Sequence, residues 1–203
     1  MTATAEEIYS REYFDYLHNR SAFRKMVRTV YLNNIRKYCI GKTIDFGCGI
    51  GELLKILPEG SMGLEVNKVV VDYCKKNNLD VNLYIPETDN YDFKMIAPGA
   101  FHTFTMNHVL EHLQHSFQVI NKIFESCHRL QIKRIVFTVP GLKGFQMDKT
   151  HETFIDMAYF KDNGLLENKL YTLSTSHYFP FNSASVGRYF RHNELRLVFN
   201  ERK

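Results

Sequence analysis

The chain has 203 residues, 44% hydrophobic and 24% charged, which predicts one soluble globular domain that needs neither a metal nor disulfides to fold. Its four cysteines form no C-x-x-C pair, so we expect reduced thiols in a cytoplasmic protein. A net charge of +4 is too small to indicate nucleic-acid binding, and no apolar run is long enough to cross a membrane.

The N-terminal part of the chain has the pattern of an amphipathic helix. Apolar and aromatic residues recur at helical spacing from Glu6 to Tyr38, which predicts one or two helices. We therefore expect residues 1–40 to form a helical cap. Some of its aromatic and basic side chains are candidates for contacts with a ligand, and packing into the core is the alternative. These side chains are Tyr9, Tyr13, Arg20 and Arg24.

Strand-like and helix-like runs alternate between residues 41 and 140. Thr43–Phe46 is the first strand-like run, and a glycine cluster and the helix-like run Glu52–Leu57 follow it. This order predicts a mostly parallel sheet with helices on both faces. Further strand-like runs are Met62–Val66, Val81–Ile85, Phe101–Met106 and Arg134–Val139, and further helix-like runs are Lys68–Lys76 and Leu110–Leu130.

The pattern changes in residues 141–203, where a loop precedes two more strand-like runs. Leu170–Phe179 and Glu194–Phe199 are separated by only about 14 residues, which suits an antiparallel edge of the sheet. We therefore predict an α/β fold with a doubly wound, mostly parallel seven-stranded sheet, helices on both faces and an antiparallel edge strand near the C-terminus. All of it forms a single domain over residues 1–203.

The glycine cluster indicates a ligand site. The sequence Asp45-Phe-Gly47-Cys48-Gly49-Ile-Gly51 links the first strand to the first helix, where open α/β sheets bind nucleotide-like ligands. Glycines allow a ligand to approach the backbone closely. The spacing departs from the G-x-G-x-x-G pattern of dinucleotide sites, and Asp45 would repel a pyrophosphate. An amino group suits Asp45 better, which favours a nucleoside that carries an amino acid.

A second acidic residue supports the same ligand class. Glu65 follows Asp45 by 20 residues and ends the second strand-like run. A carboxylate at this place can accept hydrogen bonds from both hydroxyls of a ribose. A ligand-free structural turn remains the alternative interpretation of the glycines.

Three motifs resemble those of the class I S-adenosylmethionine (SAM)-dependent methyltransferases. They are Asp45–Gly51, Gly63–Glu65 and Asn107–Leu113, and the resemblance covers roughly residues 40–140. The resemblance implies a Rossmann-like fold, with SAM as the cofactor of residues 41–140 and the acceptor on the side of residues 141–203.

The resemblance also assigns residues to the cofactor. The turn of Gly47, Cys48, Gly49 and Gly51 would lie under the methionine part. Asp45 would orient the cofactor, Glu65 would hold the ribose, and Asn107 would face the methyl group. One departure concerns the adenine: where many relatives have an acidic residue directly after the third strand, this chain has Tyr84-Ile-Pro-Glu87. Glu87 and Asp89 are the remaining candidates there.

Three histidines are candidates for the base that removes the acceptor's proton. His112 and His151 come first and His108 third, because a neutral imidazole accepts a proton near pH 7. The alternative is that each one caps a helix or bonds the sheet edge. His108-Val-Leu-Glu111-His112 also matches the H-x-x-E-H motif of zinc proteases, but that motif needs a helix, and His108 directly follows a strand-like run.

A resemblance to the small-RNA 2′-O-methyltransferases implies a possible metal. In that family two glutamates and two histidines hold a divalent ion, and this chain offers Glu111, His112 and His151, with His108 where the first glutamate would stand. Such a donor set would suit zinc or manganese better than magnesium. Our prediction for the chain is no metal.

We therefore expect a SAM-dependent methyltransferase that acts on a small molecule, by analogy a hydroxyl of a sugar or polysaccharide precursor. Aromatic residues of the C-terminal part, Tyr178 and Phe181, could stack on such an acceptor. Two alternatives stay open: metal-assisted 2′-O-methylation of RNA, and a cofactor-binding module without turnover. A nucleic-acid partner is not expected, and the sequence does not indicate an oligomeric state.

Overall fold

The computed structural model describes residues 11–12, 14–15, 19 and 21–202, and the side chains of all of these except residues 22–25. The side chains of Tyr9, Tyr13, Arg20 and Arg24, predicted above as candidate contacts, therefore lie outside the described residues. None of the helices in the described part of the chain is long and apolar enough to span a membrane. The four cysteines are buried free thiols.

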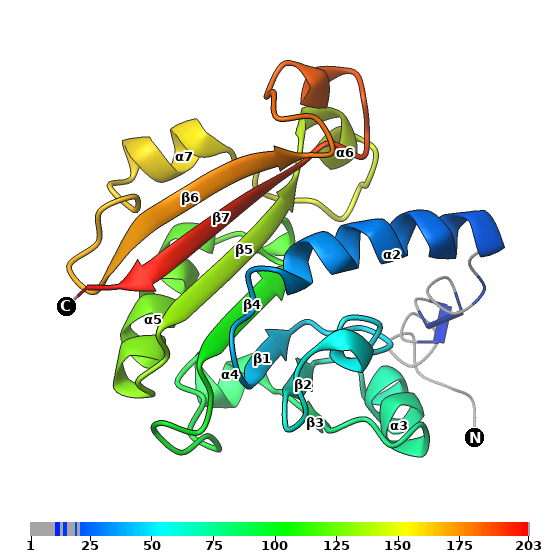
Figure 1. Cartoon of the computed structure of the whole chain (residues 1–203), viewed down its shortest axis with the longest axis vertical. Helices are drawn as coiled ribbons and strands as arrows, with labels where there is room; N and C mark the ends of the chain where they lie inside the picture. The colour runs from blue at the N-terminus through cyan, green and yellow to red at the C-terminus, as the bar shows by residue number, and fades with distance from the viewer. Residues whose placement is uncertain (1–10, 13, 16–18, 20, 203) are drawn as a thin grey trace.

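A seven-stranded sheet forms the centre of the molecule, in the order β3-β2-β1-β4-β5-β7-β6 (Figure 1). Strands β1 to β5 pair in parallel, and β7 pairs antiparallel with both β5 and β6. The predicted mostly parallel, seven-stranded sheet is therefore confirmed. The strands are β1 Thr43–Phe46, β2 Met62–Glu65, β3 Val81–Leu83, β4 Thr103–Asn107, β5 Arg134–Pro140, β6 Tyr171–Phe179 and β7 Glu194–Glu201.

The strand at the C-terminal edge differs in one detail from the prediction. The strand of opposite direction, β7, lies inside the sheet, and β6 forms the edge. The side chains explain this order: residues 195–199 of β7 are all buried, whereas the middle of β6 is exposed at Ser174–Ser176. The more apolar strand takes the position that is covered on both sides.

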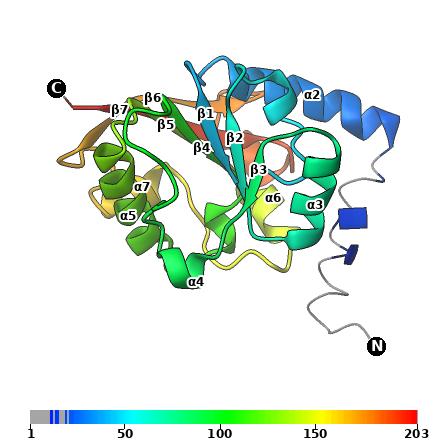
Figure 2. The same ribbon diagram turned by 90° about the horizontal axis from the view of Figure 1, so that it is seen from below.

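Helices cover both faces of the sheet, as predicted. Figure 2 shows α2 on one face and α4, α5 and α7 on the other. Helix α5 buries Ile120, Ile123, Phe124 and Cys127, spaced three to four residues apart, in the main core. The helices are α2 Ala22–Arg36, α3 Lys68–Lys76, α4 Pro86–Asp89, α5 Ser116–Arg129, α6 Leu142–Gln146 and α7 Met157–Asp162.

Two predicted helices are shorter than expected. The run before Pro58 forms only a 3-10 turn, η1 (Leu54–Ile56), because the proline ends it. The run from Leu110 divides into a 3-10 turn, η2 (Leu110–His112), and α5. The Ser116 hydroxyl donates to the carbonyl oxygens of Leu110 and Leu113, at 2.8 and 2.7 Å, and fixes this break. A third 3-10 turn, η3, spans Val186–Arg188.

The strand order brings the ends of β1 and β4 side by side. β1 lies between β2 and β4, with Asp45 level with Gly63 on one side and Thr105 on the other. From β1 the chain adds β2 and β3 on one side and then crosses over to add β4 and β5 on the other side. Ligands of open α/β sheets bind at such a switch point, which here lies between β1 and β4. Asp45 and Asn107 are thereby placed at one edge, although 62 residues separate them.

Candidate functional site at the carboxyl ends of the strands

The turn after β1 needs glycine for its backbone conformation. Gly47, Gly49 and Gly51 have φ angles of +71°, +53° and +73°, a region that other residues rarely adopt. The amide of Gly47 donates to the Leu64 carbonyl at 2.8 Å and ties the turn to β2. The turn therefore cannot be formed by residues with larger side chains without strain.

The members of this turn face different ways. Gly47 and Gly49 are partly exposed, whereas Cys48 and Gly51 are buried. Cys48 packs in a small core cluster with residues of α3, and a Cβ at Gly51 would lie 2.4 Å from the Leu79 side chain. Of the four turn residues predicted to touch a cofactor, Gly47 and Gly49 are thus partly open to solvent, whereas Cys48 and Gly51 pack against the protein interior.

Asp45 is a buried carboxylate at the base of the turn. It is 3% exposed and has no ion pair within 4.0 Å in the described part of the chain. Burial raises the pKa of Asp45 to about 7, although Arg28 and a hydrogen bond from Asn107 act to lower it. A carboxylate in such a place is stabilised by a bound cation, and none of the described side chains provides one in contact.

Glu65 joins the glycine turn to the start of α3. Its Oε2 accepts from the Gly49 amide and its Oε1 from the Asn67 amide, each at 2.9 Å. Burial raises the pKa of Glu65. Each carboxylate oxygen has a further lone pair beyond these bonds, so a ribose hydroxyl can still be accepted.

Asn107 ends β4 beside Asp45. Its amide nitrogen donates to Thr105 Oγ1 at 3.0 Å and lies 3.5 Å from Asp45 Oδ1. Among the described residues, its buried Oδ1 has no hydrogen-bond partner, and neither has the buried Oγ1 of Thr138, the residue level with it on β5. Buried polar atoms are usually paired in proteins, so these two atoms mark an edge where a ligand can supply the partner.

Arg28 is a candidate site residue that the sequence analysis missed. It extends from α2, pairs with Glu52 directly after the glycine turn, and lowers the pKa of Asp45. Its side chain is 38% exposed and could also meet a ligand carboxylate. The helical spacing of α2 gave no signal for it, because only the packing of α2 on the sheet brings Arg28 to the turn.

His108 is held between two carboxylates. Its Nδ1 lies 3.2 Å from Glu111 Oε1 and its Nε2 lies 3.1 Å from Glu194 Oε1. Burial by itself lowers the pKa of His108, but Glu194 and Glu111 outweigh it and raise the pKa to about 10. The ring is therefore protonated near pH 7 and has no nitrogen free to accept a proton. Its backbone has a φ of +55°, a strained value for a histidine.

His112 and His151 lie together next to Glu111. Their rings are 4.7 Å apart between centroids, and His151 Nε2 is 3.9 Å from Glu111 Oε1. One atom from each of the three residues lies within 4.8 Å of the others, as metal ligands would. Glu111 is fully buried, and its Oε2 has no hydrogen-bond partner in the part of the chain that the structure describes.

The hydrogen bonds of the two histidines determine which nitrogen is available. His112 Nδ1 lies 3.2 Å from the Thr150 carbonyl oxygen, and His151 Nδ1 lies 2.8 Å from that of Phe145. Thr150 Oγ1 also lies 3.1 Å from His112 Nδ1, but this hydroxyl donates to Asp148 at 2.7 Å and is left to accept. A carbonyl can only accept, so both Nδ1 atoms carry the hydrogen. In the neutral rings both Nε2 atoms therefore keep their lone pairs, for a proton or a metal ion.

The two acidic candidates for contact with the adenine, Asp89 and Glu87, differ in their hydrogen bonds. The Asp89 carboxylate accepts from the Tyr84 hydroxyl and from the amides of Phe93 and Lys94, at 2.5 to 3.0 Å. It closes the loop after β3 and is committed to that structural role. Glu87 is exposed and no hydrogen bond of its side chain is found in the described residues.

The arrangement of strands and helices is shared with known methyltransferase structures. A SAM-dependent methyltransferase from Archaeoglobus fulgidus superposes with a TM-score of 0.64 at 17% identity, over 92% of this chain and 97% of that one. The small RNA methyltransferase HEN1 superposes with a TM-score of 0.62 at 17% identity, over 89% of this chain and 25% of HEN1.

A third structure, the methyltransferase domain of bacterial CtHen1-C, has a TM-score of 0.59 and 19% identity over 87% of this chain and 96% of that domain. No protein-family model and no curated protein sequence matches the chain. The strand order and these superpositions establish that the chain has the Rossmann-like fold of the SAM-dependent methyltransferases.

Proposed function

We propose that the protein is a SAM-dependent methyltransferase that methylates a hydroxyl group of a sugar-type small molecule. The observation that carries the proposal is the buried Asp45 carboxylate beside the glycine turn, which has no ion pair in the described part of the chain. The ammonium group of SAM would supply the missing cation. The unpaired Asn107 Oδ1 next to it supports the same location.

The residues of the site suit each part of that cofactor. Asp45 would bind the ammonium group, Glu65 the ribose hydroxyls, and Arg28 the carboxylate of the methionine part. The partly exposed backbone of Gly47 and Gly49 would allow the ligand to lie close to the turn. SAM supplies an electrophilic methyl group bonded to a positively charged sulfur.

The reaction needs alignment and a base. The acceptor oxygen forms a bond to the methyl carbon while the carbon–sulfur bond breaks, and the hydroxyl proton must leave. We assign this proton to Nε2 of His151 or His112, whose Nδ1 atoms are held by carbonyl oxygens. His108 is the weakest of the three candidates, because both of its nitrogens face carboxylates.

Transfer of labelled methyl groups from SAM to a panel of sugars and nucleotide sugars tests the proposal. We expect His151→Gln to lower the rate by about 10²- to 10⁴-fold. The matched variant His115→Gln, at an exposed position directly before α5, should leave the rate unchanged. Binding of SAM without product on any acceptor would favour the alternative of a module without turnover. Cytoplasmic location stays a prediction.

A second candidate function is metal-assisted 2′-O-methylation of RNA. The observation that favours it is the cluster of Glu111, His112 and His151, in which a buried carboxylate oxygen has no partner among the described residues. This donor set fits zinc or manganese, and these three residues would hold the ion, which would polarise the acceptor hydroxyl. The His108 cation on the other oxygen of Glu111 opposes the binding of a metal.

Metal binding separates the two functions. The protein and its His112→Ala variant are titrated with Mn²⁺ and Zn²⁺ by calorimetry, and methyl transfer to short RNA is measured with and without EDTA. The RNA function is supported if the wild type binds the metal, His112→Ala abolishes this binding, and EDTA stops the transfer. Methyl transfer to a sugar that persists in EDTA would instead support the metal-free reaction.

A further inference from the structure

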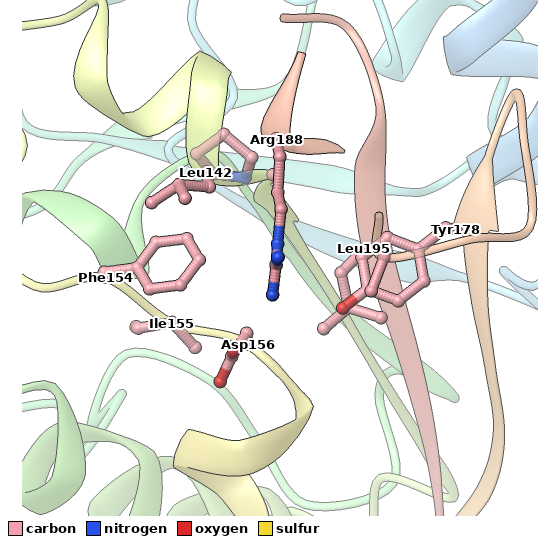
Figure 3. Close-up of a pocket in the computed structure, with 10 residues that line it drawn as sticks. Leu142, Phe154, Ile155, Asp156, Tyr178, Arg188 and Leu195 are labelled. Atoms are coloured by element: carbon pink, nitrogen blue, oxygen red, sulfur yellow. The ribbon is translucent and has the colours of Figure 1, made fainter. Parts of the chain in front are cut away.

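A small pocket lies at the carboxyl end of β5, on the side of the sheet that carries α7. Its volume is about 140 Å³. Leu142, Ile155 and Leu195 form apolar walls, and Phe154 and Tyr178 add aromatic rings (Figure 3). The volume is well below the roughly 300–1,000 Å³ of sites that enclose a whole ligand. The pocket can therefore hold one chemical group of a larger molecule.

Two opposite charges face each other across this pocket. Figure 3 shows the Arg188 side chain extending from η3 into the pocket, between Phe154 and Tyr178 and toward Asp156. In the described part of the chain the Arg188 guanidinium has no hydrogen bond and no carboxylate within 4.0 Å. Asp156 Oδ1 accepts from the Tyr159 amide at 2.9 Å and caps α7. Its second oxygen is left for another donor.

The backbone that carries Arg188 is firmly packed. Gly187 lies against Gly141, where a Cβ on Gly187 would be 3.3 Å from the Gly141 Cα. The side chain of Asn193 makes two hydrogen bonds within the segment that joins β6 to β7. It donates to the Ser183 carbonyl at 2.8 Å and accepts from the Phe181 amide at 3.1 Å. The backbone at Arg188 is thus fixed, whereas its side chain is exposed and becomes ordered when a ligand binds.

The pocket is connected to the candidate catalytic histidines by aromatic contacts. The Phe154 ring, one of its walls, meets the Phe145 ring edge-on at 5.3 Å between centroids. Phe145 stacks on His151, also at 5.3 Å. The loop that carries His151 therefore also lines the pocket, which places the pocket on the acceptor side of the proposed site.

We propose that this pocket binds the phosphate group of a phosphorylated sugar, the acceptor of the methyl group. The inference rests on the proposed function and adds the anionic group that its acceptor carries. The planar guanidinium of Arg188 can donate two hydrogen bonds to phosphate oxygens. Asp156 repels a bare anion but accepts from a hydroxyl, so the ligand must present a hydroxyl beside its phosphate. The two features together select a sugar phosphate over inorganic phosphate.

Calorimetric titrations of the full chain with glucose 1-phosphate, glucose and inorganic phosphate test this. We expect glucose 1-phosphate to bind more tightly than the other two probes. Arg188→Gln should weaken its binding by about 10- to 100-fold, and Asp156→Asn, which can still cap α7, should reduce the preference for glucose 1-phosphate over inorganic phosphate. Arg191→Gln, an exposed arginine three residues along the chain, is the control for net charge and should change affinity less than twofold.

Two further arms identify the source of the phosphate and separate this inference from the proposed function. UDP-glucose and a short RNA are titrated into the wild type and Arg188→Gln, and the ligand whose affinity depends on Arg188 identifies the source. Equal affinity of both proteins for every phosphate probe would overturn the inference. Titration with S-adenosylhomocysteine is independent of the pocket: if it binds while the phosphate probes do not, only the pocket assignment fails.

Discussion

Replacement of Asp45 by asparagine should make the protein more stable and its cofactor site weaker. Asparagine has the shape of the protonated acid and carries no charge. Burial raises the pKa of Asp45 from 3.8 to about 7 in the folded chain. The folded protein therefore keeps a proton that the unfolded chain releases, and the free energy of unfolding of the wild type falls as the pH rises through this range.

The size of the effect follows from the shift in pKa. One pKa unit corresponds to 1.36 kcal/mol, so ionisation of Asp45 costs about 4 kcal/mol of stability above pH 7. Between pH 5 and pH 7 the loss grows by about 2 kcal/mol. The Asp45→Asn variant lacks this group, so its advantage over the wild type should increase by that amount over the same interval.

Urea unfolding of both proteins at pH 5, 6, 7 and 8 measures this difference directly, because all other titrating groups are common to the two proteins. The affinity for SAM, measured at pH 7.5, should fall at the same time, since the variant has no charge for the ammonium group. Parallel stability curves for the two proteins would refute the argument that Asp45 is a buried, uncompensated carboxylate.

Three other substitutions test separate parts of the account. Gly49→Val should abolish SAM binding in a titration, because a β-branched residue is strained at a φ of +53° and covers the backbone that the ligand approaches; unchanged affinity would place the ligand elsewhere. Glu65→Ala leaves the amides of Gly49 and Asn67 without an acceptor, so both the unfolding free energy and the SAM affinity should drop by about 1–3 kcal/mol; a loss in stability alone would show that Glu65 holds the turn and does not bind the ribose. Ile123→Ala, at a fully buried position of α5, should lower the free energy of unfolding in urea by about 2–5 kcal/mol and leave the SAM affinity unchanged. A change in that affinity would contradict a purely structural role.

The grouping of the residues proposed for the cofactor could be predicted from the sequence because their positions follow from strand order. Asp45 ends a strand before a glycine turn, Glu65 ends the next strand and Asn107 the fourth. In a parallel sheet all three positions lie at one edge. Alternating patterns sufficed to place these strands, so the cluster needed no knowledge of long-range packing.

The acceptor half could not be predicted in the same way. Glu194 meets His108 only because β7 pairs antiparallel with β5, with Glu194 level with Pro140. The strands of the C-terminal pair were recognised, but their order within the sheet was not. The ion pair between Glu194 and the protonated His108 follows from that order. Arg28 and Arg188 likewise reach their positions because α2 and the segment of η3 pack against the rest of the fold. The local spacing of residues does not predict this packing.

Calorimetric titration of the purified protein with SAM and with its demethylated product tests the central claim most directly, with NAD as the control. The account predicts binding of both sulfur compounds with micromolar dissociation constants, no binding of NAD, and a loss of SAM affinity in Asp45→Asn. Absence of binding by both sulfur compounds would contradict the proposed function and leave the glycine turn a structural feature of the fold.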